Sequence, residues 1–195
     1  FTTDSGNPQR EDFPQYMVRD WNVDKRRGKL ARELLSNANG VSFDWYQQLS
    51  FDSTLYWPKA ERSNWISQFD LLKQQEPDLA GRLKPYLDAL LKWDGKADKT
   101  STAALLCISW YEELYGTSQA EGIKSEYKGD PRKQLIALGR VAKRLEELHG
   151  DWRLPWGEVH RLQRTAYSAD TMEAGVSLLP FAASQACAGA PGPLG

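Results

Sequence analysis

Apolar residues recur every three or four positions through most of the chain, which is the period of an amphipathic helix. This pattern predicts helices over residues 25–36, 43–49, 58–75, 78–93 and 131–149. A further helix is expected after Ser101 or Thr102, either of which can cap it, with Gly116 as its stop. The chain is therefore predicted to be mainly helical, with five or six helices.

Residues typical of helix boundaries support these limits. The predicted N-caps of three helices are Asp24, Ser42 and Asp130, and two glycines that lie just beyond helix ends are Gly40 and Gly150. Pro58 and Pro131 suit a first helical turn. Pro85 lies inside the segment 78–93 and should kink that helix or split off its first turn.

The helical period ends at Gly150. Residues 158–164 are predicted to form a short helix or a strand, and the apolar run 176–183 a strand in need of partners. The chain opens on a polar stretch, closes on turn-forming residues, and has neither an initiator Met nor a signal peptide. We expect it to be an internal piece of a larger protein.

Composition and charge exclude several classes of protein. Hydrophobic residues make up 41% of the chain and charged residues 26%, as in ordinary soluble domains. The net charge of −1 predicts no attraction to nucleic acid or to an anionic membrane. No apolar run reaches the roughly 20 residues that a membrane-spanning helix needs.

The cysteine and tryptophan residues add two expectations. Cys107 and Cys187 lie far apart, so one disulfide is possible, but two buried free thiols are favoured. The eight tryptophans are numerous for this length, and we expect them to pack in the core. Stacking of a carbohydrate or another ligand is the alternative.

Residue spacing alone points to no catalytic site. The sequence has no glycine-rich phosphate loop, no Cys-x-x-Cys pair and no nucleophile elbow. His149 and His160 are not accompanied by the spacing of zinc ligands. Pattern and composition together therefore predict only a mainly helical domain.

Five segments, in order, resemble the middle of the β-chain of the penicillin acylase (penicillin amidase) family. They are residues 1–16 (FTTDSGNP followed by FPQY), 24–35 (DKRRGKLARELL), 49–54 (LSFDST), 91–95 (LKWDG) and 156–161 (WGEVHR), the last followed by Leu179-Pro180 and residues 189–195. Each motif is weak alone, but their common order and spacing extend over nearly the whole chain.

The resemblance implies a fold and a domain organisation. Members of this family are N-terminal nucleophile hydrolases with an αββα core. The chain would be a mainly α helical subdomain of such an α/β enzyme, with a C-terminal strand-like segment that lacks its sheet partners. Residues 1–23 would lead from the catalytic core, 24–150 would form the helical domain, and 151–195 would return toward the sheet.

The resemblance also implies a mechanism in which most of the catalytic groups lie outside this chain. In the family an N-terminal Ser attacks the amide carbonyl and its own α-amino group is the base, while an Asn side chain and a backbone N–H hold the oxyanion. That Ser would lie well upstream of Phe1 and the Asn shortly before it. Of this group only a supporting Arg is present, and Arg27 is the best match. Arg26 and Lys25 are adjacent alternatives, and a solvated helix-start charge is the competing interpretation.

No cofactor is implied for this part of the enzyme. Some family members bind calcium partly through an Asp at the place where Met17 stands, so no calcium ligand is supported here. His160 lies in a family-like motif, and a structural hydrogen-bonding role is expected for it.

The resulting hypothesis is a fragment of an amidohydrolase that releases an acyl group from an amine and is inactive alone. The motifs are closer to acyl-homoserine-lactone and lipopeptide acylases than to aryl-acetyl penicillin enzymes. Expected partners are a small-molecule amide and the remainder of the same precursor, its α-chain and the rest of its β-chain. Family members are usually exported, which implies a periplasmic or secreted location. The alternative is a stand-alone helical binding or scaffold domain without catalysis.

Overall fold

The computed structural model describes residues 10–17, 26–36, 38–116, 123–167 and 174–180 of the chain. The chain divides into two compact units, residues 1–52 and 53–195, which we call the N-terminal unit and the C-terminal unit. The domain limits predicted above, at 23/24 and 150/151, stay predictions.

The N-terminal unit contains two short 3-10 helices, η1 (Arg10–Asp12) and η2 (Gln15–Met17), and two α-helices, α1 (Arg26–Ser36) and α2 (Phe43–Ser50). The predicted cap of α2 is confirmed, because the Ser42 hydroxyl accepts a hydrogen bond from the Trp45 N–H at 3.1 Å. Asp24, the predicted cap of α1, lies outside the described residues.

Few side chains of the N-terminal unit are buried. Among its described residues only Leu30 is below one tenth exposed. Tyr16 is 88% exposed, Phe43 79% and Phe51 81%. Burial of apolar surface is the main stabilising contribution to folding, so the described side chains of this unit contribute little of that stabilisation.

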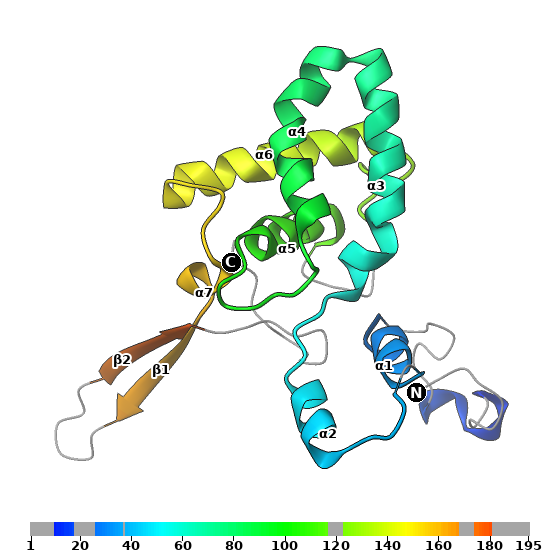
Figure 1. Ribbon diagram of the computed structural model, residues 1–195, viewed down its shortest axis with the longest axis vertical. Coiled ribbons are helices and arrows are strands. Elements are labelled where there is room, and N and C mark those ends of the chain that lie inside the picture. The colour runs from blue at the N-terminus through cyan, green and yellow to red at the C-terminus, as the bar shows by residue number, and fades with distance from the viewer. Residues whose placement is uncertain (1–9, 18–25, 37, 117–122, 168–173, 181–195) are drawn as a thin grey trace. The chain divides into compact units, whose positions relative to one another are not determined.

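The C-terminal unit holds four long helices, a short helix and a β-hairpin (Figure 1). The long helices are α3 (Tyr56–Gln75), α4 (Pro77–Lys92), α5 (Thr102–Tyr115) and α6 (Pro131–His149). They are followed by α7 (Trp156–Val159), β1 (Arg161–Tyr167) and β2 (Ala174–Pro180). The prediction of a mainly helical chain is confirmed.

The long helices enclose one hydrophobic core. Helices α3 and α4 run side by side, α6 packs across them and α5 packs against α6 (Figure 1). The core holds leucines from α4, α5 and α6 together with tryptophans from several segments: Leu87, Leu90, Leu105, Leu106, Leu138, Leu145, Trp57, Trp65 and Trp110. Burying each such side chain contributes about 1.5–3 kcal/mol relative to leaving it exposed.

Most predicted helix ends agree with the structure. The Ser101 hydroxyl, rather than Thr102, caps α5 by accepting the Ala104 N–H at 3.3 Å. Asp130 caps α6 by accepting the Lys133 N–H at 3.0 Å. Gly150 ends α6 with φ +86°, a left-handed conformation that favours glycine.

Two helix predictions need correction, both at prolines. Helix α3 begins at Tyr56, two residues before the predicted start at Pro58, although Pro58 does lie in the first turn as predicted. Helix α4 runs from Pro77 to Lys92 without interruption, so Pro85 does not split off a first turn, while the alternative, a kink at Pro85, stays a prediction. The leucines on either side of Pro85, Leu83 and Leu87, are both buried, and tertiary packing of this kind offsets the hydrogen bond that proline removes.

The C-terminal predictions also need correction. The segment 158–164 is neither one helix nor one strand, since α7 ends at Val159 and β1 begins at Arg161. The predicted strand is confirmed as β2, but it does not lack a partner, because it pairs antiparallel with β1 from Arg161↔Pro180 to Tyr167↔Ala174. Residues 181–183 lie outside the described part. A local hairpin supplies the partner that the apolar pattern alone did not reveal.

Candidate functional site

Arg27, the predicted catalytic residue, is the second residue of helix α1. Its backbone is helical, as the sequence predicts, while its side chain is outside what the structure describes. The neighbouring Arg26 is half-buried and engaged in an interaction. The catalytic role of Arg27 therefore stays a prediction.

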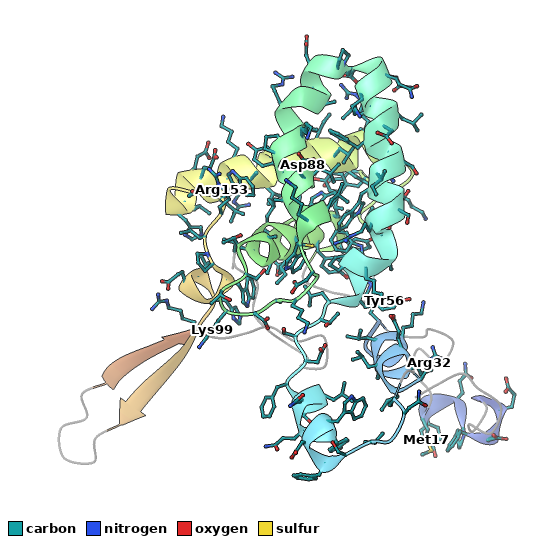
Figure 2. All side chains as sticks on the ribbon, viewed as in Figure 1. Met17, Arg32, Tyr56, Asp88, Lys99 and Arg153 are labelled. Carbon is teal, nitrogen blue, oxygen red and sulfur yellow. The ribbon has the colours of Figure 1, made fainter. Side chains whose placement is uncertain are left out.

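Met17 ends the short helix η2 and is 61% exposed (Figure 2). Its thioether is a poor ligand for calcium, which prefers six to eight oxygen atoms. Over the described ranges no three His, Cys, Asp or Glu side chains gather into a group that could hold a metal ion.

The two histidines lie in unlike surroundings. His149 is the exposed last residue of α6. His160 follows α7, is 6% exposed and stacks on Trp156 with ring centroids 4.5 Å apart and planes 15° from parallel. The structure shows a packing role for the His160 ring, and the hydrogen-bonding role expected for it stays a prediction.

Backbone hydrogen bonds join the family-like motif at 156–161 to the loop that precedes α5. The Trp156 N–H donates to the Ser101 carbonyl and the Gly157 N–H to the Lys99 carbonyl, both at 2.8 Å. The His160 N–H donates back to the Trp156 carbonyl at 2.8 Å. Lys99, labelled in Figure 2, lies on this loop. The motif therefore fixes the point at which the chain leaves the helices and enters β1.

An aromatic cluster joins the start of α3 to α5. The Trp57 ring meets Trp65, Trp110, Tyr111 and Tyr115 edge-on, with centroid distances of 5.1, 5.5, 5.0 and 6.0 Å. Edge-to-face pairs of this kind stabilise by about 0.5–1.5 kcal/mol beyond the area they bury. The expectation that tryptophans pack in the core holds for the six that are buried, which are Trp57, Trp65, Trp93, Trp110, Trp152 and Trp156.

Two neighbouring carboxylates of α5 have opposite environments. Burial alone would raise the pKa of Glu113, but hydrogen bonds from the Tyr127 hydroxyl and from Arg140 outweigh it and lower that pKa. Burial raises the pKa of Glu112 to about 7, and among the described residues no charge or hydrogen bond opposes this shift. Glu112 is thus the one described carboxylate on this helix whose burial is uncompensated.

Cys107 is a free thiol in the middle of α5 and is 1% exposed. Burial raises its pKa far above the ordinary range, so the reactive thiolate does not form at neutral pH. The predicted buried free thiol is confirmed for Cys107, whereas Cys187 lies outside the described residues. Cys107 therefore contributes packing, not chemistry.

Sequence reasoning missed both Glu112 and the Glu113–Tyr127–Arg140 group. The available signal was a pair of acidic residues inside an otherwise apolar helical stretch, 102–115, between two tyrosines spaced by four. Which of the two carboxylates is paired with a cation depends on Tyr127 in the loop before α6 and on Arg140 in α6. Sequence spacing does not reveal these partners.

The described structure is thus a mainly helical domain that ends in a β-hairpin. A family model described as penicillin amidase matches residues 3–191, and the chain belongs to the penicillin amidase family. A search of curated proteins found no match. No helix in the described part is long and apolar enough to cross a membrane. Membership of this family makes the intact protein an amide hydrolase.

Proposed function

We propose that this chain is part of an acylase that hydrolyses linear amides and releases an acyl chain from an amine. The observation that carries the proposal is the family match over residues 3–191, which spans both compact units. The motif similarities noted above favour an aliphatic acyl group, as in acyl-homoserine-lactone and lipopeptide acylases.

The family resemblance places the main catalytic groups of the proposed reaction upstream of Phe1. An N-terminal nucleophile hydrolase uses a hydroxyl or thiol on its first residue, with the α-amino group of that residue as base. We infer that the Ser and the oxyanion Asn come from the remainder of the precursor, and that Arg27 supports them.

Two further inferences depend on the same resemblance. The precursor is exported to the periplasm or secreted, and its α-chain and the rest of its β-chain are the partners of this chain. Both are tested by the sequence upstream of Phe1, which should encode an export signal, a self-cleavage site with Ser, and an Asn shortly before Phe1. A native start codon immediately before Phe1 would overturn the fragment hypothesis.

Activity measurements provide the direct test. The intact precursor should hydrolyse long-chain acyl-homoserine lactones or lipopeptide amides, and the purified 195-residue chain should hydrolyse neither. A matched preparation in which the precursor Ser is replaced by Ala controls for contaminating acylase. Turnover by the 195-residue chain alone would contradict the proposed division of catalytic groups.

A further inference from the structure

The loop that joins α4 to α5, residues 93–101, is bonded to the segment through which the chain enters α3 (Figure 1). The Leu55 N–H donates to the Gly95 carbonyl and the Ala97 N–H to the Ser53 carbonyl, both at 2.9 Å. Each bond joins segments that lie far apart in the sequence. The entry to the long helices is therefore fixed to this loop by its backbone.

The same loop is bonded to the segment through which the chain leaves the long helices. Its carbonyls at Lys99 and Ser101 accept the N–H groups of Gly157 and Trp156, both at 2.8 Å. Trp156 and Gly157 are buried. Buried backbone groups are almost always paired, because an unpaired one loses its hydrogen bond to water. The exit is therefore fixed to the loop as well, within a few residues of the entry.

Asp98 and Ser101 connect these two attachments. The Ser53 hydroxyl, on a residue that is 4% exposed, donates to the Asp98 carboxylate 45 residues further along the chain. The Asp98 carbonyl accepts the Ser101 N–H at 2.9 Å, and the Ser101 carbonyl accepts the Trp156 N–H. A continuous series of hydrogen bonds thus runs from the entry segment, through two residues of the loop, to the exit segment.

Two attachments on one short loop should not open independently. The bond between the Asp98 carbonyl and the Ser101 N–H makes a turn of the loop, and the entry segment holds this turn in place. If the entry detaches, the carbonyls that bind the exit lose their fixed position. Proteins open locally in cooperative units, and native-state hydrogen exchange measures the free energy of each opening.

We propose that residues 95–101 form a conformational joint that couples the entry and the exit of the helical part, so that residues 53–160 open and move as one body. The ends of domains often lie close together, which is why a domain can be inserted into a longer chain, and hinge movement is one way in which domains close on a ligand. The joint is defined by this chain alone, whereas its role during turnover rests on the proposed function.

Hydrogen exchange of the 195-residue chain, followed by NMR, tests the coupling. Ser53→Ala removes the hydroxyl that binds the Asp98 carboxylate. It should lower the protection of the Ala97 amide and of the remote Gly157 amide by at least about fivefold each, because hydrogen bonds to charged groups are strong. An effect at Ala97 without one at Gly157, or an equal effect throughout the four long helices, would overturn the proposal.

Ser67→Ala is the matched control. The Ser67 hydroxyl donates to the Ser63 carbonyl at 3.1 Å, on an exposed face of α3. This variant also removes a serine hydroxyl from the C-terminal unit, but it does not touch the joint. Protection at Ala97 and Gly157 should therefore match that of the parent, and a loss equal to that in Ser53→Ala would contradict the assignment.

An engineered disulfide tests the joint in the opposite direction, also if Ser53→Ala misfolds. Thr54 and Lys96 face each other in an isolated antiparallel bridge. The bonds on either side make them a non-hydrogen-bonded pair, whose side chains are close enough for a disulfide. Thr54→Cys with Lys96→Cys, in a Cys187→Ser background, is compared in its oxidised and reduced forms. Oxidation should raise the protection of the Gly157 amide at least about threefold, and unchanged protection would contradict the coupling.

Turnover of the intact precursor with the same disulfide tests the role of the joint, with a long-chain acyl-homoserine lactone as substrate and the parent under the same redox conditions as control. Because the joint stays closed while the helical part moves, the oxidised and reduced forms should be equally active. A loss of turnover that reduction restores would show that the joint opens, and would overturn the proposal. Absence of turnover in the parent would instead contradict the proposed function, and hydrogen exchange would still decide the coupling.

Discussion

Gly139 of α6 lies so close to Leu83 of α4 that a Cβ atom built on the glycine would be 2.5 Å from Leu83 Cδ2. Atoms do not approach to that distance, so one of the two helices or the leucine would have to move. Leu83 is 4% exposed and held by the surrounding core. The two helices can cross here because Gly139 has no side chain.

Gly139→Ala should therefore destabilise the chain although alanine is the better helix former. Alanine gains about 1 kcal/mol of helix propensity, but overpacking a core costs about 1–3 kcal/mol. We expect a net loss of about 1 kcal/mol in the free energy of unfolding, measured by urea denaturation.

Gly81→Ala is the matched control, since Gly81 lies inside α4 and nothing lies within 4 Å of a Cβ built there. That variant should be more stable than the parent by about 0.5–1 kcal/mol. Stabilisation by both substitutions would show that the crossing of α4 and α6 can relax.

Tyr127→Phe tests the hydrogen bonds that stabilise the ionised carboxylate of Glu113. The Tyr127 hydroxyl donates to Glu113 and accepts a hydrogen bond from Arg140, and the residue is 5% exposed. Hydrogen bonds to charged groups contribute about 1.5–3 kcal/mol, so the variant should lose roughly that amount in urea denaturation. Tyr46→Phe, at a 58% exposed position, should change stability by less than about 0.5 kcal/mol.

Glu112→Gln should stabilise the chain in a pH-dependent way. The folded-state pKa of Glu112 is raised from 4.5 to about 7 by burial, so the folded chain binds more protons than the unfolded chain between these values. Stability of the parent therefore falls as the pH rises through this window. The variant cannot titrate and avoids that loss.

Urea denaturation at pH 5 and pH 8 measures the effect. The variant should exceed the parent by about 1 kcal/mol at pH 8, after allowance for the screening of a partly exposed group, and by less at pH 5. The other carboxylates are the same in variant and parent, so their contributions to the free energy of unfolding cancel in the difference between the two. An equal difference at both pH values would show that the pKa of Glu112 is not raised.

Arg27→Ala is predicted to lower turnover of the intact enzyme at least about tenfold, a loss of about 1.4 kcal/mol of transition-state stabilisation. An Arg remains protonated and presents several donors in a fixed fork, which suits support of the oxyanion or of its neighbours. The melting temperature should be nearly unchanged if the residue acts in catalysis.

Arg26→Ala is the internal control and should leave turnover near that of the parent. If Arg26→Ala lowers turnover instead, the supporting Arg is Arg26 rather than Arg27. No effect from either variant would leave Arg27 as a solvated charge at the start of the helix.

The sequence predicted the helices well where local chemistry determines them. Ser42, Asp130 and Gly150 act on backbone groups within three or four residues, so their positions alone place the ends of α2 and α6. The first turn of α4 is not split off at Pro85, and the burial of Leu83 and Leu87 beside this proline is a tertiary effect that the sequence pattern does not show. The pairing of β1 with β2 was missed because an apolar run shows that a strand needs a neighbour, not which segment supplies it.

The candidate site was harder to predict for the same reason. Five short motifs indicated the family, which the match over residues 3–191 establishes. They carry no information on which of Glu112 and Glu113 meets a cation, because Arg140 is 27 residues from Glu113 along the chain. Interactions between distant segments determine the electrostatics of α5, and a single sequence does not encode them in its spacing.

The cluster of Trp57, Trp65 and Trp110 provides the chain with a built-in optical signal. Three indole rings whose centroids lie 5.1 to 5.5 Å apart, held at fixed angles, couple electronically and produce near-ultraviolet circular dichroism. That signal depends on fixed side-chain packing and disappears in compact states that keep only their helices. Loss of the near-ultraviolet bands before the far-ultraviolet helical signal would therefore mark the point at which α3 separates from α5 while both segments remain helical.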